Sequence, residues 1–143
     1  MLHTKITKLM EKENSRLLKL FNDFEKKSRI NIKSSIELFN TFKWNLERRI
    51  FLEEKIIYTV YSLWQNEEII SDLLKEHKEL LYLLNKIEET LNNNHIPVTS
   101  IFKDNLIDHL TDESIYLYPQ FEEILKQSEK NLLIERMEES ITN

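Results

Sequence analysis

The chain lacks three features that many small proteins depend on: cysteine, glycine and long apolar runs. The absence of cysteine excludes disulfides and thiolate metal sites, so any metal ion must be held by nitrogen and oxygen ligands. With no glycine and only two prolines in 143 residues, the chain has few of the residues that tight sheet hairpins need. We therefore expect an all-α protein with short connections.

Charge and hydropathy exclude two large classes of partner. The net charge is −5, the isoelectric point is about 5.5, and acidic and basic residues are interspersed, so neither nucleic acid nor an anionic membrane is expected as a partner. No apolar run approaches the roughly 18 residues of a membrane span, and the first residues do not have the pattern of a signal peptide. We expect a cytoplasmic protein. No nucleophile–base arrangement or glycine-rich phosphate loop predicts an enzyme.

Apolar residues recur at steps of three and four, which predicts amphipathic helices. The expected helices cover residues 5–27, 34–64, 67–92 and 99–125, followed by a short terminal helix over 128–140. Their inward stripes comprise Met10, Leu17, Phe21 and Phe24; Phe39, Phe42, Leu46, Ile56, Val60 and Leu63; Ile70, Leu73, Leu80, Leu84, Ile87 and Leu91; and Phe102, Leu106 and Tyr116. Short connections make neighbouring helices antiparallel, so the prediction is a single-domain up-down-up-down four-helix bundle.

The connections carry recognisable signals. Residues 28–33 are polar, and Ser34 or Ser35 is expected to cap the second helix. Gln65-Asn66 predicts a tight reversal, and 92–97 predicts a loop. Pro119 is expected to kink or interrupt the fourth helix because it removes one backbone hydrogen bond. Ser128 is expected to cap the terminal helix.

The sequence also repeats itself. Residues 42–46 match residues 102–106 at an offset of 60. The same offset pairs three further positions: Arg49 with His109, Glu53 with Glu113, and Tyr58 with Tyr118. We therefore interpret residues 5–64 and 67–125 as two copies of one helix pair.

Six polar residues interrupt the apolar stripes: Asn14, Arg49, Glu53, His77, His109 and Glu113. Arg49 and Glu53 are spaced i,i+4 and share a helix face, as do His109 and Glu113. In antiparallel helices, residues equidistant from a turn lie side by side, and this places all six in one layer of the bundle. Burying such groups is costly unless they are paired or bind a metal ion. The layer therefore predicts a site.

The second half of the chain carries the more specific motif. His77 on one helix and His109-x-x-x-Glu113 on the next, followed by Tyr118-Pro119, resemble the hemerythrin-like (HHE cation-binding) family. Members of that family typically hold a non-haem di-iron centre with histidine terminal ligands and two bridging carboxylates. The resemblance implies that His77 and His109 are terminal ligands and that Glu53 and Glu113 are carboxylate ligands.

The first half departs from the family pattern. Asn14 and Arg49 stand where two histidines are expected, and Leu73 stands where oxygen-carrying members have an additional histidine. Arginine stays protonated at all ordinary pH values. Our hypothesis is that Arg49 occupies the place of one metal ion and forks onto both carboxylates, Glu53 and Glu113. Asn14 is expected to support the site by hydrogen bonding without binding the metal.

These observations leave three functions open. The first is a metal-binding protein with one ion, or an atypical pair, that serves O₂, NO or redox sensing or protection; iron is expected, and manganese or zinc also suits the ligands. The second is a metal-free bundle that acts as a structural or protein-interaction module, in which Arg49 and a protonated histidine balance the carboxylates. The third is a weak peroxidase or oxidase that uses the same site.

Overall fold

The computed structural model of the chain describes residues 5–59 and 67–142. Three predicted features lie outside these residues: the inward positions of Val60 and Leu63, and the reversal at Gln65-Asn66. None of the helices in the described part of the chain is long and apolar enough to cross a membrane.

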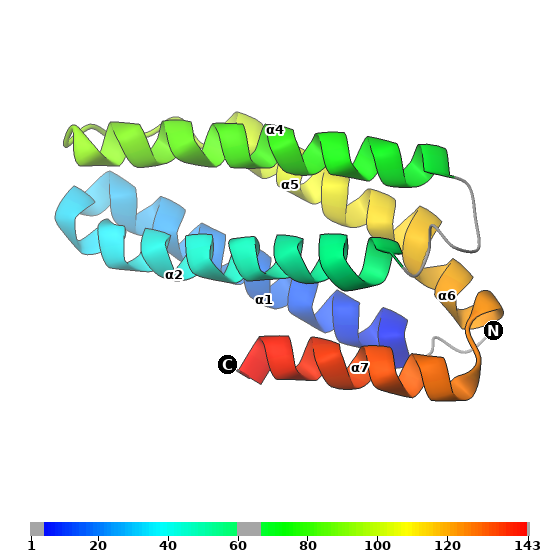
Figure 1. Ribbon diagram of the computed structural model, residues 1–143. Helices are drawn as coiled ribbons and strands as arrows, with labels where there is room; N and C mark the ends of the chain where they lie inside the picture. The colour runs from blue at the N-terminus through cyan, green and yellow to red at the C-terminus, as the bar shows by residue number, and fades with distance from the viewer. Residues whose placement is uncertain (1–4, 60–66, 143) are drawn as a thin grey trace.

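The described elements are helices throughout. In chain order they are α1 (Lys5–Ile30), α2 (Ile32–Leu52), the π-helix η1 (Glu53–Ile57), α4 (Glu67–Asn92), α5 (Ser100–Asp112), the π-helix η2 (Glu113–Leu117), α6 (Tyr118–Ile124) and α7 (Gln127–Thr142). α2 continues into η1, and α5 continues through η2 into α6, so four antiparallel rods form the bundle and α7 folds back beside α1 and α2 (Figure 1). The predicted all-α bundle is confirmed.

The first connection is shorter than predicted. α1 runs to Ile30, and the single residue Asn31 separates it from α2. Asn31 has an extended backbone (φ −153°, ψ 107°), and its side chain accepts a hydrogen bond of 3.0 Å from the backbone N–H of Ser34. The predicted cap at Ser34 or Ser35 is therefore wrong. Asparagine caps a helix as well as serine does, and here it satisfies a free amide of the first turn.

The loop between α4 and α5 follows the prediction for 92–97. Asn94 adopts a positive φ of 60°, a conformation that asparagine tolerates better than most residues at the end of a helix. The backbone N–H of His95 donates a hydrogen bond of 3.0 Å to the carbonyl of Thr90, one of the carbonyls at the C-terminal end of α4. α5 then begins at Ser100, one residue after the predicted start, and Thr99 is its N-cap residue.

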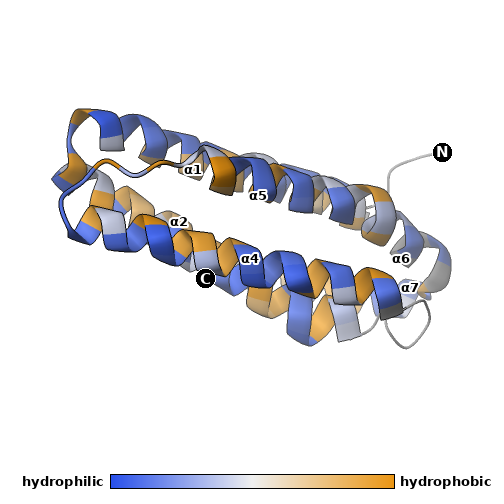
Figure 2. Cartoon of the chain, turned by 90° about the horizontal axis from the view of Figure 1, so that it is seen from above, coloured by the Kyte–Doolittle hydropathy of each residue, from blue (hydrophilic) through white to orange (hydrophobic). Residues whose placement is uncertain are grey.

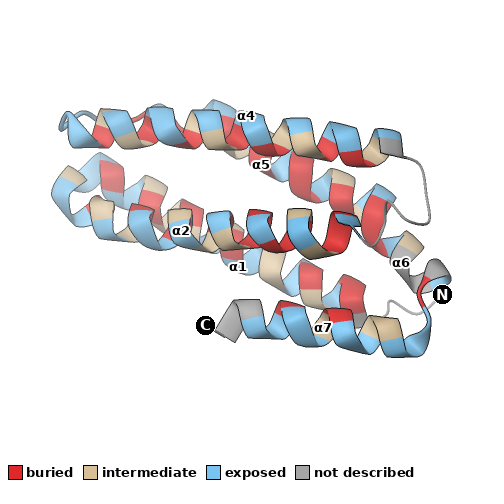
Figure 3. Ribbon diagram, viewed as in Figure 1, coloured by how far each residue is buried: buried red, intermediate tan, exposed pale blue. Residues whose placement is uncertain are grey.

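The core consists of two apolar clusters with a polar layer between them. One cluster consists of leucines and isoleucines packed around five phenylalanines: Phe21, Phe24, Phe39, Phe42 and Phe102. Their ring centroids are 4.9–5.8 Å apart, a spacing that favours tilted and edge contacts. The other cluster is mainly aliphatic and extends from Ile6 to Met137. Each helix buries one stripe and leaves a hydrophilic face outside (Figures 2 and 3).

The two π-helices shift the inward stripe by one residue. Ile57 and Leu117 are fully buried, whereas Ile56 is half-buried and Tyr116 is 54% exposed. The prediction that Tyr116 points inward is therefore wrong, because a π turn holds more residues than an α turn. Pro119 does not break its rod. The helix widens just before it, and Pro119 then lies in the first turn of α6, where a missing N–H is tolerated.

The terminal helix also begins differently from the prediction. α7 starts at Gln127, so Ser128 lies within its first turn and does not cap it. Instead the side chain of Glu129 accepts a hydrogen bond of 2.9 Å from the backbone N–H of Lys126. This contact is the glutamate half of a capping box.

Candidate metal centre

The structure brings together four of the six predicted polar residues: Glu53, His77, His109 and Glu113. One ligand atom from each lies within 4.8 Å of every other, and all four side chains are 0–3% exposed. The two imidazoles meet directly, with 3.0 Å between their Nε2 atoms. Oε1 of Glu53 lies 3.2 Å from Nε2 of His77, and Oε1 of Glu113 lies 3.3 Å from Nε2 of His109.

Two outer carboxylates orient the imidazoles. Nδ1 of His77 lies 2.8 Å from Glu54, and Nδ1 of His109 lies 2.7 Å from Glu76. An ionised carboxylate accepts only, so each Nδ1 carries a proton and donates it. A neutral imidazole then presents the lone pair of Nε2 to the centre of the bundle. This carboxylate–histidine arrangement is the one that fixes histidines bound to metals in proteins.

Two buried tyrosines cross-link the inner carboxylates. Tyr58 donates a hydrogen bond of 2.7 Å to Glu113, and Tyr118 donates one of 3.0 Å to Glu53. Tyr58 directly follows η1, which begins at Glu53, and Tyr118 directly follows η2, which begins at Glu113. The backbone N–H of each tyrosine donates to the carbonyl of the glutamate that begins its own π-helix. The π turn therefore places a glutamate and a tyrosine five residues apart on the same inner face.

Arg49 lies beside the two inner carboxylates. Its guanidinium is 3.9 Å from Glu53 and 3.6 Å from Glu113. These distances are those of ion pairs, and a side-chain hydrogen bond with Tyr118 adds to the charge of the two carboxylates in raising the pKa of Arg49. Arg49 therefore spans both carboxylates by charge, without the forked hydrogen bonds that the sequence suggested.

Asn14 stands at the edge of the layer. Its amide nitrogen lies 3.4 Å from the hydroxyl of Ser114, and no hydrogen bond to the four central residues is formed among the described atoms. Its side-chain oxygen is buried without a partner in the described part of the chain. His95 is exposed in the loop before α5 and is not part of the cluster. His3 lies outside the described residues.

The charges of the layer are strongly coupled in the absence of a metal ion. Burial raises the pKa of Glu113 well above its usual range, and the negative charge of Glu53 raises it further. Burial also opposes ionisation of Glu53, but hydrogen bonds from Glu113 and both histidines lower its pKa well below the usual range. One proton is thus held on Glu113 and one negative charge on Glu53.

His109 gains a proton in the same state. Burial alone lowers its pKa, but the carboxylates of Glu113, Glu53 and Glu76 outweigh it and raise the pKa to about 10. Burial likewise lowers the pKa of Arg49, and the charge of Glu53 raises it above its already high value. Without a metal, the layer therefore holds protons at His109 and Glu113 and a fixed charge at Arg49.

The donor set suits a transition-metal ion. Two imidazole nitrogens and two carboxylates, all buried, match iron, manganese or zinc. Two neutral imidazoles with both Nδ1 protons directed outward would leave two lone pairs facing each other at 3.0 Å. A metal ion, or the proton of a charged histidine, would remove this repulsion; the hydroxyl of Tyr58 also lies 3.1 Å from Nε2 of His77. Oε1 of Glu113, which lies 3.3 Å from His109 and 3.6 Å from Arg49, is a further possible ligand atom.

The roles of Glu54, Glu76 and the two tyrosines were not predicted from the sequence. Glu54 directly follows Glu53, and Glu76 directly precedes His77. A residue adjacent to a ligand faces sideways toward the next helix, so an acidic residue there is a usable signal. The matched positions of Tyr58 and Tyr118 were visible in the repeat, but the π turns that direct them inward were not.

The chain is similar to a known protein family. A family model described as the Hemerythrin HHE cation binding domain matches residues 5–101, which is more than half of the chain. No curated protein and no solved structure matches. The matched range includes Glu53 and His77 and ends before His109 and Glu113, whose place in the cluster comes from the geometry.

Proposed function

The chain belongs to the hemerythrin HHE cation-binding domain family, and from this premise we propose that its polar layer binds one transition-metal ion. His77, His109, Glu53 and Glu113 would hold the ion, and iron is the metal that we propose. Its role would be sensing of, or protection against, O₂, NO or redox change. When bound, iron supplies a centre that can exchange one electron.

The contact between the two Nε2 atoms carries this proposal. Both histidines direct Nδ1 toward an outer carboxylate, so both present Nε2 inward at a separation of 3.0 Å. Roughly 3 Å is also the separation of two adjacent nitrogen ligands that each lie about 2.1 Å from one metal ion. The four side chains already lie together, so binding of the ion requires only that it displace the protons that they hold.

Arg49 supports a single ion rather than a pair. Its guanidinium faces Glu53 and Glu113 from the first half of the chain, where the family pattern expects a histidine. It cannot bind a metal ion, because it has no free lone pair and keeps its proton. It supplies instead one positive charge to the two carboxylates.

The residues around the layer hold it in place and exclude water. The apolar clusters cover it on both sides along the bundle axis, and the hydroxyls of Tyr58 and Tyr118 fix the orientation of Glu113 and Glu53. Buried groups held in this way keep their ligand geometry with little cost in reorganisation.

A metal titration tests the proposal. Chelator-treated protein is titrated anaerobically with Fe²⁺, or with Co²⁺ to follow ligand-field absorption, and one equivalent is expected to saturate the site. His77→Ala should abolish this signal. His95→Ala, which removes an exposed histidine, is the matched control and should leave the stoichiometry at one. Saturation that is equal in both variants would refute the assignment of His77.

A second candidate function rests on the charge balance of the metal-free layer. Arg49 and a protonated His109 can together balance Glu53 and the outer carboxylate of Glu76 without an ion, while Glu113 is neutral because it holds a proton. The bundle would then be a structural or protein-interaction module. Thermal unfolding distinguishes the two functions, because an ion that binds only the native state raises the melting temperature. A module of this kind would melt at the same temperature with Fe²⁺ and with chelator.

A further inference from the structure

Three large apolar side chains are exposed on the side of the bundle where α7 lies along α2 and η1. Trp44 and Phe51 of α2 are 50% and 64% exposed, and Leu132 of α7 is 53% exposed. Apolar side chains scattered singly are normal on a protein surface, whereas a contiguous group of them marks a site of interaction. The question is therefore whether these three side chains form one surface.

Two open hollows join them into one groove between α2–η1 and α7. Trp44 and Phe51 line the first hollow, and Leu132 lines the second. Ile56 and Arg136 line both, so the two hollows are continuous. We call this surface the α2–α7 groove, and its apolar floor is formed by six side chains: Trp44, Phe51, Leu52, Ile56, Leu132 and Leu133.

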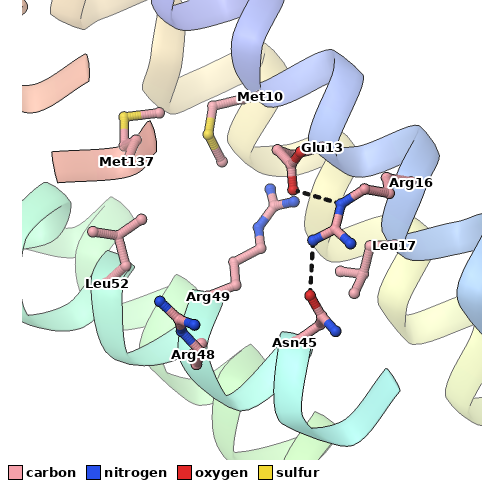
Figure 4. A pocket seen from close by; sticks show the side chains of 9 residues that line it. All are labelled: Met10, Glu13, Arg16, Leu17, Asn45, Arg48, Arg49, Leu52 and Met137. Atoms are coloured by element: carbon pink, nitrogen blue, oxygen red, sulfur yellow. Dashed lines mark hydrogen bonds and ion pairs between the residues drawn. The ribbon is translucent and has the colours of Figure 1, made fainter. Parts of the chain in front are cut away.

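α7 is fixed to the bundle by its inner face and does not cover this groove. Met137 is fully buried and lies near Leu52 of α2 and Met10 of α1 (Figure 4). Leu133 is buried in the same apolar cluster. Leu132, the neighbour of Leu133, consequently faces outward, and the described residues of the chain leave it exposed together with Trp44. The apolar floor is therefore available to a second molecule.

The groove differs from the chain as a whole in its charge balance. Three basic and three acidic side chains line it: Arg48, Lys55, Arg136, Glu47, Glu129 and Glu139. The whole chain carries a net charge of −5, so its excess of negative charge lies outside the groove. Two copies of an acidic protein repel each other over most of their surfaces, and this repulsion is weakest where the charges balance. The groove is thus a surface on which a second copy can approach.

The charges are also ordered along the groove. Glu47, Phe51 and Lys55 are spaced four residues apart and are all exposed, so they share the outer face of the rod that α2 and η1 form. Phe51 lies midway between an acidic and a basic residue. A two-fold axis near Phe51 therefore places Glu47 of each copy opposite Lys55 of the other, which makes this face complementary to itself.

We infer that a second copy of this chain docks on the α2–α7 groove, with a two-fold axis near Phe51 and the two α2 helices antiparallel. Phe51 and Trp44 of each copy pack on the apolar floor of the other. Aromatic residues and arginine dominate the binding energy of such interfaces, and Arg48, which lies 4.3 Å from the ring of Trp44, adds a cation to this surface. The pairs of Glu47 with Lys55 lie at the rim, where they fix the orientation more than the affinity.

Sedimentation velocity of the full chain over a range of concentrations tests this inference. We expect a reversible equilibrium between the chain of 17.4 kDa and a species of twice that mass. The dimer should form both in chelator-treated and in metal-loaded protein, because the groove contains none of the four proposed metal ligands. A failure of metal binding would therefore leave this inference intact.

An apolar substitution locates the interface. Phe51→Ser should weaken self-association at least about tenfold, because it removes the aromatic side chain nearest the two-fold axis. Ile101→Ser is the matched control: Ile101 is 62% exposed, like Phe51, but it lies on α5 outside the groove. The control should leave the dimer unchanged. Because both substituted side chains are exposed, both variants should fold, and circular dichroism verifies this before sedimentation.

A charge swap tests the two-fold arrangement. Glu47→Lys and Lys55→Glu should each weaken the dimer, since like charges then meet at both ends of the interface. The double variant, with both substitutions in one chain, should recover the affinity of the parent protein. A mixture of the two single variants should form heterodimers, because each chain then offers the charge that the other needs.

Three outcomes would overturn the inference. The first is a chain that stays monomeric at every concentration, which would leave the groove to a partner of a different sequence. The second is a dimer that Phe51→Ser weakens no more than Ile101→Ser does, which would place the interface elsewhere. The third is a double charge variant that associates no better than the single variants, which would exclude the antiparallel pairing of Glu47 with Lys55.

Discussion

Two helical segments, 60 residues apart, form the two halves of the polar layer: the end of α2 with η1, and the end of α5 with η2. In each segment a glutamate begins the π turn and a tyrosine follows it. The hydroxyl of each tyrosine donates a hydrogen bond to the glutamate of the other segment. One turn before the glutamate, the first segment has Arg49 and the second has His109. The same backbone frame therefore presents a fixed cation in one half and a proposed metal ligand in the other.

The partner helices continue this difference. α4 faces the layer with His77, whereas α1 contributes Asn14 at its edge. Both imidazoles thus belong to the α4–α5 half, and Arg49 belongs to the α1–α2 half. We interpret the two halves as having different tasks: one holds the two proposed nitrogen ligands, and the other compensates the charge of the carboxylates.

Removing Glu113 should have the largest effect on this comparison. Glu113→Ala deletes a proposed ligand and leaves Arg49 with Glu53 alone, so the affinity for Fe²⁺ should fall at least about 100-fold. Asp108→Ala, which removes an exposed carboxylate one residue from His109, is the control. Metal per chain after gel filtration measures the result. A Glu113→Ala variant that retains its metal would disprove the ligand assignment.

Making the first half like the second should produce a second site. Arg49→His, combined with Asn14→His, restores the nitrogen ligands that the family pattern expects, and the metal content should rise from one ion to two per chain. Arg48→His is the matched control, because Arg48 stacks over Trp44 at 4.3 Å instead of facing the layer. Without a gain in metal, Arg49 does not occupy the position of a second ion.

The two halves should also differ in how they respond to pH. In metal-free protein the pKa of His109 is about 10, above its unfolded value of roughly 6.5. Its contribution to stability is fully present below pH 6.5 and is lost as the pH rises through 10, a change on the order of a few kcal/mol. The raised pKa of Glu113 acts in the same direction, whereas Arg49 stays charged throughout.

Urea unfolding of chelated protein at several pH values between 6 and 10 measures this loss. His109→Gln should flatten the profile, because the residue with the titrating imidazole is gone. Metal-loaded protein should show a weaker decline, since protons compete with the ion and the site binds more tightly as the pH rises. A profile that is flat in the chelated parent protein would contradict the coupling of His109 to its carboxylates.

The outer carboxylates should have the smallest effect. Glu54 of η1 orients His77, and Glu76 of α4 orients His109. Glu54→Gln and Glu76→Gln should each weaken metal binding roughly 10–100-fold by loosening the ring and lowering its basicity. The exposed Glu79→Gln is the control. Variants that bind the metal as tightly as the control would show that these contacts are not needed for the site.

Much of this architecture was predictable from the sequence. Apolar spacing defined four rods, and polar interruptions placed Glu53, His77, His109 and Glu113 at one height. Both predictions depend on helix periodicity and on symmetric distances from short turns, which single side chains seldom override. The proposed repeat stays a prediction, although both π turns begin at positions that the offset of 60 relates.

The rest depended on geometry that periodicity does not contain. A π turn changes the register by one residue, so Tyr116 is exposed and Leu117 is buried. The predicted caps of α2 and α7 were also wrong. Serines were expected to cap both helices, but the side chains of Asn31 and Glu129 accept the hydrogen bonds at their N-termini. The ion-pair spacing of Arg49 depends on two helices at once. These features follow from tertiary packing and not from local sequence.

Metal content per chain is the most direct test of the central claim. The protein is purified without added metal and without affinity-tag histidines, and elemental analysis is normalised to its concentration. We predict close to one iron per chain, held by His77, His109, Glu53 and Glu113. No bound metal, even after anaerobic loading with Fe²⁺, would contradict the claim and leave a bundle whose charges are balanced by Arg49 and by protons on His109 and Glu113.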